Sequence, residues 1–182
     1  MIFTKTEIPE VVIIEPKVFK DERGYFFESF NQQEFTENIG KINFEQDNES
    51  KSTFGVLRGL HFQKPPFAQA KLVRCIQGKV LDVVVDIRPK SPTYGKSISV
   101  LLSEENKKQL FIPRGFAHGF VVLSKEAIFS YKVDNTYAPK YEDGILWNDK
   151  ILAIDWQIAS EKIIISTKDK ILPTFNKFDS PF

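Results

Sequence analysis

Apolar residues recur at every second position along much of the chain, which is the period typical of β-strands. The clearest case is the segment KVLDVVVDIR at 79–88, in which every second residue from Leu81 to Ile87 is apolar. This alternation predicts a strand with one apolar face. It is preceded by another short β-branched run in the segment AKLVRCIQGK at 70–79, with Gln77-Gly78 as a plausible tight turn between them, so the two runs together predict a β-hairpin.

Further short strands follow a similar pattern, and most of them are separated by Gly, Pro, Asn, Asp or Ser. They are expected at residues 11–14, 25–30, 43–46, 56–62, 98–102, 109–112, 117–123, 128–133, 144–147 and 163–165. Many short strands at close spacing predict an all-β fold, either a sandwich or a barrel. No repeat, low-complexity tract or change in composition marks a linker, so residues 1–182 are expected to form a single domain.

Two segments depart from the strand pattern. A short helix is expected after Asn31, with Asn31 as its N-cap, Glu34 at the capping-box position and Gly40 at its end. After about Trp156 the pattern becomes less regular, which predicts a tail that lies over the body of the protein.

Charge and cysteine content narrow the functional classes. The formal net charge is +1, which excludes the broad basic field that sequence-independent binding to nucleic acids or membranes requires. The first residues lack the features of a secretory signal, and no apolar run approaches the ~18 residues of a membrane span. Cys75 is the single cysteine and lies in an apolar run, which indicates an inert buried thiol and excludes an internal disulfide. A cytoplasmic protein is expected.

One segment, at residues 44–63, is unusually rich in polar side chains for a strand region. It contains Gln46, Asn48, Arg58 and His61. In a regular strand Arg58 and His61 would point to opposite faces, so their joint action would require a bulge, which Gly59 would permit.

A second histidine, His118, lies between two glycines in the segment GFAHGF. Two histidines raise the hypothesis of a metal site, but there is no His-x-His pair and no third histidine, and common sites use three protein ligands. The sequence therefore favours acid–base chemistry, for which a histidine oriented by a carboxylate is suited. Asp169 is a candidate for that carboxylate, although its position equally fits a solvated loop residue. No serine-hydrolase or glycine-rich phosphate-binding motif is present.

Several motifs closely resemble, in order, those of the dTDP-4-dehydrorhamnose 3,5-epimerase family. They are DERGYFFESF, QDNESKSTFGVLRGLHFQ, QAKLVRCIQGKVLDVVVDIR, SPTYG, NKKQLFIPRGFAHGF, FSYKVDNTYAP, EDGILWND and IDW. The resemblance spans roughly residues 20–170. It implies a cupin-type double-stranded β-helix, or jelly roll, in a homodimer that needs neither metal nor organic cofactor.

The resemblance also implies a reaction. The family inverts C3 and C5 of dTDP-4-dehydro-6-deoxy-D-glucose, which gives dTDP-4-dehydro-L-rhamnose on the route to dTDP-L-rhamnose. Both carbons flank the C4 ketone, so each inversion requires a base, a group that stabilises an enolate oxygen, and an acid on the opposite face.

Carried over by position, the family's catalytic roles fall on four residues. His61 resembles the base, Asp169 its orienting partner and Tyr131 the acid. Lys71 resembles the donor that stabilises the enolate oxygen. His118 resembles a residue that lines the sugar site.

The family's substrate-binding positions are implied in the same way. Arg23, Arg58 and Lys168 are suited to the diphosphate, whereas Glu28, Gln46, Asn48 and Glu142 resemble positions that bind the base or sugar or order the pocket. In this family the N-terminal segment reaches toward the partner subunit, so Arg23 and Glu28 are expected to complete the neighbour's site.

Three other functions stay open at this point. The closest is an epimerase that inverts only C3 or only C5, or that takes a related nucleotide-linked 4-keto sugar. The others are a non-catalytic cupin that binds a sugar and a metal-dependent cupin oxygenase.

Overall fold

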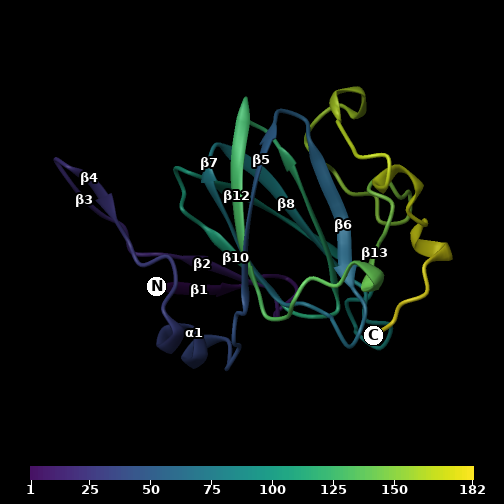
Figure 1. Ribbon diagram of the computed structural model, residues 1–182, viewed down its shortest axis with the longest axis horizontal. Coiled ribbons are helices and arrows are strands. Elements are labelled where there is room, and N and C mark those ends of the chain that lie inside the picture. Colours follow the sequence, from purple (N-terminus) through teal and green to yellow (C-terminus); the bar gives the residue numbers. More distant parts are fainter.

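The computed structural model describes residues 1–182 and contains two antiparallel sheets that face one another (Figure 1). In spatial order the first sheet comprises β1 (Ile2–Lys5), β2 (Val12–Glu15), β10 (Gln109–Ile112), β7 (Lys71–Gln77), β12 (Glu126–Val133) and β5 (Gln46–Thr53). The second comprises β13 (Glu142–Gly144), β6 (Leu57–Gln63), β11 (Phe116–Val122), β8 (Lys79–Asp86) and β9 (Ser97–Ser103). The predicted all-β jelly roll is confirmed.

Apolar clusters fill the space between the sheets and cover both outer faces. The largest cluster lies between the sheets and includes Val84 and Phe129. On the outer face of the second sheet, Trp156 and other residues of the C-terminal segment pack against Val83 and its neighbours. On the outer face of the first sheet, Phe35 packs against the strands. The predicted C-terminal tail over the body is therefore confirmed, and Figure 1 shows it beside β6.

The predicted hairpin with its turn at Gln77-Gly78 is wrong. β7 pairs with β10 and β12, whereas β8 pairs with β11 and β9, so the two segments belong to different sheets. Gly78 forms the corner between them with φ +76, and a Cβ at this position would overlap the backbone oxygen of Glu126. The prediction of one apolar face is also wrong, because β8 is buried on both faces.

Seven other segments match the strand predictions closely or in part. The strands predicted at 11–14, 56–62, 98–102, 109–112, 117–123 and 128–133 are present, with ends within two residues, and the one at 25–30 survives as a shorter strand, β4 (Gly24–Phe26). The strands predicted at 43–46 and 144–147 are wrong, since only one residue of each, Gln46 and Gly144, is in a strand, and 163–165 contributes only an isolated bridge between Ile164 and Val56. Four strands were not predicted: β1, β3 (Phe19–Asp21), β5 and β13.

The single α-helix, α1 (Gln32–Asn38), begins as predicted. The Asn31 side chain accepts hydrogen bonds from the backbone N–H groups of Gln33 and Glu34. The Glu34 carboxylate binds the N-terminal amine of Met1 at 2.5 Å. Short 3₁₀ turns occupy Pro139–Tyr141, Ser160–Lys162, Asp169–Ile171 and Phe175–Lys177. None of the helices has the length and apolar character needed to cross a membrane.

The β3–β4 hairpin forms a separate two-stranded ribbon. Figure 1 shows it extending away from the two main sheets, on the side opposite the C-terminal segment. Its aromatic residues are unusually exposed: Phe19 is 52%, Tyr25 57% and Phe26 67% accessible.

Candidate active site

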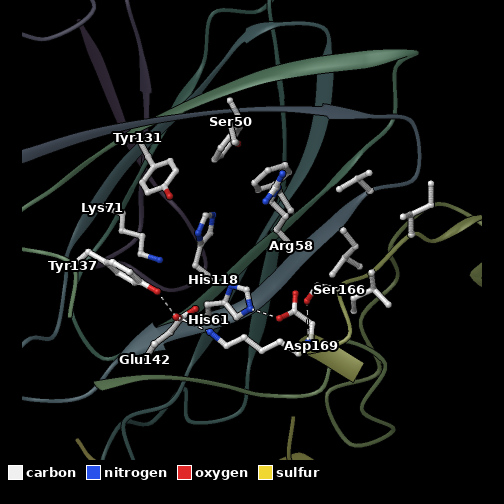
Figure 2. Close-up of a pocket in the computed structure, with 17 residues that line it drawn as sticks. Ser50, Arg58, His61, Lys71, His118, Tyr131, Tyr137, Glu142, Ser166 and Asp169 are labelled. Atoms are coloured by element: carbon white, nitrogen blue, oxygen red, sulfur yellow. Dashed lines mark hydrogen bonds and ion pairs between the residues drawn. The ribbon is translucent and has the colours of Figure 1, made fainter. Parts of the chain in front are cut away.

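A cavity of about 550 Å³ opens between the two sheets (Figure 2). Its lining comes from three parts of the chain. The first sheet contributes Ser50, Lys71, Phe129 and Tyr131; the second contributes Leu57, Arg58, His61, His118, Phe120 and Glu142; connecting and C-terminal segments contribute Val56, Tyr137, Ile164, Ile165, Ser166, Lys168 and Asp169. The site therefore combines polar groups from opposite walls with an apolar lining.

A bulge in β6 allows Arg58 and His61 to line the same cavity. His61 lies opposite His118 on β11 and Arg58 lies opposite Phe120, so two residues of β6 match the single Gly119 between them. Gly59 has φ +134, and a Cβ on it would overlap the backbone of Gly119. The bulge that joint action of Arg58 and His61 would require, and that Gly59 permits, is therefore present.

His61 and Asp169 form a hydrogen-bonded pair in the cavity wall. His61 Nε2 lies 2.8 Å from Asp169 Oδ1. The Asp169 side chain is only 5% exposed. Burial opposes its ionisation, but the hydrogen bond and charge interaction with His61, together with hydrogen bonds to Ser166 and the Gly59 backbone, lower the pKa of Asp169. In the neutral form of the His61 ring, ionised Asp169 accepts a hydrogen bond from Nε2–H, which leaves the Nδ1 lone pair to act as the base.

Tyr131 and Lys71 project from the first sheet, on the wall opposite His61 (Figure 2). Burial raises the pKa of the Tyr131 phenol, so the hydroxyl stays protonated at neutral pH. Burial also lowers the pKa of the Lys71 ammonium to about 8, partly offset by Asp82 and Glu142. The Lys71 ammonium makes no hydrogen bond or ion pair with another side chain, so its charge is available to a ligand.

His118 is held at the back of the cavity by a second carboxylate. His118 Nε2 lies 2.8 Å from Asp82 Oδ2, and both side chains are buried. Burial lowers the pKa of His118 and raises the pKa of Asp82. The His118 ring is therefore neutral at ordinary pH. Since Nε2 is engaged with Asp82, Nδ1 is the ring nitrogen left for a ligand.

Glu142 organises the mouth of the cavity. Its Oε2 accepts a hydrogen bond from the Tyr137 hydroxyl at 2.6 Å and an ion-pair contact from Lys168 Nζ at 2.6 Å. Burial opposes ionisation of Glu142, but these two contacts lower its pKa. Next to this group, Gln46 Nε2 donates to Asn48 Oδ1 at 2.8 Å, and both residues line an adjoining cavity of about 280 Å³.

Ten of the twelve predicted site residues line these two adjoining cavities; Arg23 and Glu28 do not. Arg23 lies in the turn of the β3–β4 hairpin with its side chain 85% exposed and paired with Asp21. Glu28 accepts a hydrogen bond from Asn31, next to α1. Their predicted role in a neighbouring subunit's site stays a prediction.

The sequence reasoning missed three residues that matter to the site. Tyr137 places a 54% exposed ring at the cavity mouth, and Asp82 orients His118. The signal for Asp82 was its position within the apolar run of β8, because a buried carboxylate requires a partner. The third, Ser50, was one of several polar residues in a segment not predicted to be a strand. No group of three or more His, Cys, Asp or Glu side chains is arranged to hold a metal ion.

A jelly roll that holds a histidine–carboxylate pair opposite a tyrosine and a lysine defines a cupin-type protein equipped for acid–base chemistry. The sequence profile of the dTDP-4-dehydrorhamnose 3,5-epimerase family matches residues 5–177. The chain therefore belongs to the dTDP-4-dehydrorhamnose 3,5-epimerase family and is an isomerase.

Individual relatives agree with this assignment. The dTDP-4-dehydrorhamnose 3,5-epimerase of Shigella flexneri is 61% identical over 166 residues, which is 91% of each chain. The structure of a dTDP-6-deoxy-D-glucose-3,5-epimerase from Legionella pneumophila in complex with dTDP-4-keto-L-rhamnose superposes with a TM-score of 0.94, at 48% identity over 97% of this chain and 94% of that one. A 3′-monoepimerase from Streptomyces bikiniensis in complex with dTDP-quinovose gives 0.88, at 32% identity over 93% and 86%.

Proposed function

We propose that this protein inverts C3 and C5 of dTDP-4-dehydro-6-deoxy-D-glucose to give dTDP-4-dehydro-L-rhamnose. One observation carries the proposal: His61, fixed by Asp169, and Tyr131 line one cavity from opposite walls, with an unpaired Lys71 beside them. This arrangement offers a base on one face of a sugar ring and an acid on the other.

The first step is removal of a proton next to the ketone. His61 Nδ1 takes the proton from C3 or C5, the electron pair of the broken C–H bond forms a C=C bond to C4, and the C4 oxygen becomes an enolate. Asp169 stabilises the imidazolium that forms, as the carboxylate does in hydrolase triads. The Lys71 ammonium stabilises the enolate oxygen, and burial of the ammonium strengthens this interaction because little water competes for it.

The second step returns a proton to the opposite face. Tyr131 donates its phenolic proton to the carbon, the C4 ketone reforms, and the configuration at that carbon is inverted. The protein is left with a protonated His61 and a Tyr131 phenolate, and proton exchange with solvent restores both. A second pass of the same two groups inverts the other carbon.

Nucleotide recognition is proposed for the mouth of the cavity. The exposed Tyr137 ring offers an aromatic face on which a base can stack. Lys168 is 59% exposed and supplies a charge for the diphosphate, together with Arg58. Glu142, Gln46 and Asn48 order the pocket through the contacts described above.

Two substitutions test the roles of the base and the acid. His61→Asn and Tyr131→Phe should each reduce kcat by about a thousandfold or more, because each removes one proton-transfer group. Binding of dTDP, measured by calorimetry, should stay close to that of the wild type. Turnover near the wild-type rate in either variant would refute the corresponding role. Absence of turnover by the wild-type protein, with dTDP still bound, would instead favour a non-catalytic sugar-binding cupin.

A second candidate is a single-site epimerase acting on a related nucleotide-linked 4-keto sugar. The specific observation in its favour is the similarity to the monoepimerase structure, which shows that this fold also hosts single inversions.

The proposed reaction uses only side chains of this protein, so activity should survive exhaustive chelation. Loss of activity on chelation would instead favour a metal-dependent cupin.

We also propose that the protein is a homodimer with sites completed across the interface. The extended β3–β4 hairpin, with exposed Phe19, Tyr25 and Phe26, supports this proposal, because exposed apolar surface of this kind marks interaction sites. Arg23 in the hairpin turn and Glu28 after it are the residues proposed to reach the partner's nucleotide.

A further inference from the structure

The strand β5 presents a polar stripe to the interior of the jelly roll. Every second residue from Gln46 to Ser52 is partly or fully buried, whereas the residues between them are exposed. The four inward-facing residues are Gln46, Asn48, Ser50 and Ser52. A wholly polar inner face is unusual in a sandwich, where inner faces form the apolar core. The stripe therefore serves a cavity and not the core.

Three members of this stripe have partners within the protein. Gln46 and Asn48 hydrogen-bond to each other at 2.8 Å. Ser52 Oγ accepts a hydrogen bond from Arg58 Nε at 3.2 Å. The Ser50 hydroxyl is buried, and no protein group pairs with it. Buried hydroxyl groups normally have a hydrogen-bond partner, so this exception within a cavity wall requires an explanation.

The position of Ser50 indicates which part of a ligand it meets. Ser50 lies opposite Phe129 on β12, and its neighbour on the same face, Asn48, lies opposite Tyr131. Ser50 and Tyr131 are thus adjacent on the same wall of the cavity, away from the exposed Tyr137 at the mouth. A hexose whose reacting carbons lie between His61 and Tyr131 would contact this part of the wall.

We propose that Ser50 is a substrate-binding residue whose hydroxyl hydrogen-bonds to a hydroxyl group of the hexose and so orients the ring between base and acid. A serine hydroxyl both donates and accepts, which matches a sugar hydroxyl, whereas the diphosphate is matched by the charges of Arg58 and Lys168. This inference rests on the proposed function, because it takes the hexose to lie between His61 and Tyr131.

Calorimetric titration of the wild type and Ser50→Ala with dTDP and with the unreactive dTDP-glucose tests the inference. Ser50→Ala should weaken dTDP-glucose binding about three- to tenfold, the usual range for one neutral hydrogen bond, and leave dTDP binding unchanged. The value of kcat/KM for the 4-keto substrate should fall by at least the same factor. The melting temperature of the unliganded protein should not fall, since no protein hydrogen bond is lost.

Two serine variants provide matched controls. Ser130→Ala changes a residue on the neighbouring strand β12 whose side chain faces the other side of the sheet, and it should leave binding of both ligands unchanged. Ser103→Ala removes a buried hydroxyl that accepts hydrogen bonds from the backbone of Glu105 and Asn106, and it should lower the melting temperature. A Ser50→Ala variant that behaves like Ser103→Ala has lost a structural group, and this result would overturn the inference.

Two further outcomes would also overturn it. An equal loss of affinity for dTDP and dTDP-glucose would place the contact at the nucleotide, and unchanged affinity for both would mean that Ser50 makes no contact. Failure of the proposed function would be detected by a different measurement. The wild-type protein would then not turn over the 4-keto substrate, whatever Ser50→Ala does to the binding of dTDP-glucose.

Discussion

Asp169 determines which nitrogen of His61 is free to act as a base. Its carboxylate is acceptor-only when ionised, so it accepts from Nε2–H and leaves Nδ1 unprotonated. The two residues lie 108 positions apart in the sequence, in β6 and in a C-terminal turn. The lowered pKa of Asp169 keeps this carboxylate ionised at neutral pH.

Replacing Asp169 by Asn should therefore reduce kcat sharply while sparing ligand binding. An amide can donate to Nε2 and so stabilise the wrong tautomer, an effect that lowers kcat by about a thousandfold or more in hydrolase triads. Steady-state kinetics and dTDP titration measure the two quantities. A variant that retains kcat within about twofold would show that the pair is structural.

Lys71 determines the alkaline limb of the pH profile. The pKa of its ammonium is lowered to about 8, so the charge proposed to stabilise the enolate is present below that pH and is lost above it. The raised pKa of Tyr131 keeps the acid protonated in this range. We predict that kcat/KM falls as the pH rises through about 8. In Lys71→Arg, whose guanidinium remains charged, the fall should move to higher pH even if the maximum rate is lower. An unchanged limb in this variant would contradict the assignment.

At the scale of elements, the β3–β4 hairpin permits a test of the proposed shared site. If Arg23 acts in the partner's site, co-expressed Arg23→Ala and His61→Asn subunits form mixed dimers in which one of the two sites has both native residues. With random pairing about half of the dimers are mixed, so activity should recover to about a quarter of wild type when both single variants are inactive. Activity no higher than that of the separate variants would contradict a site shared between subunits.

The C-terminal segment covers the outer face of the second sheet and supplies Asp169. Trp156 is 4% exposed, belongs to the cluster on that face, and donates its indole N–H to the Trp147 carbonyl. Trp156→Ala should lower the free energy of unfolding by about 3–5 kcal/mol, as is usual for a buried aromatic residue. Ile171→Ala, at an 82% exposed position, should change it by less than about 0.5 kcal/mol. Denaturant titrations measure both values. If Trp156→Ala lowered the free energy of unfolding as little as Ile171→Ala does, the packing of Trp156 would contribute little to stability.

Sequence patterns predicted the core strands well because those strands carry apolar residues on their inner faces. β5 was not predicted, because its inward-facing residues line a cavity and are as polar as the outward-facing ones. The error at β7 and β8 has a different cause. The Gln77-Gly78 connection is compatible with a tight hairpin turn or with a corner between sheets, and only the pairing of distant strands distinguishes them.

The candidate site was predictable to different degrees. His61, Tyr131 and Lys71 were identified through family motifs and line the same cavity. Asp82 was overlooked because its partner is on another strand, and Tyr137 because a single tyrosine in a connecting segment has no distinguishing pattern. The role of such residues depends on contacts between segments that are distant in the sequence, and the local alternation of apolar and polar residues carries no information about these contacts.

At the scale of the whole molecule, the overall charge is nearly balanced, but cationic side chains gather in one cavity. The net charge is +1, yet Lys71, Lys168 and Arg58 all line one cavity. Affinity for a nucleotide diphosphate should therefore depend on these three cationic side chains and not on a general electrostatic field.

The proposal that residues 1–182 form one domain predicts a single cooperative unfolding transition, which dTDP shifts to higher temperature.

The central claim is that one base and one acid invert two carbons of the same sugar. The most direct test is incubation of the protein with dTDP-4-dehydro-6-deoxy-D-glucose in heavy water, followed by nuclear magnetic resonance of the product. The proposed mechanism predicts solvent deuterium at both C3 and C5 of a product with the L-rhamno configuration. Deuterium at only one of the two carbons would contradict it and would identify a single-site epimerase.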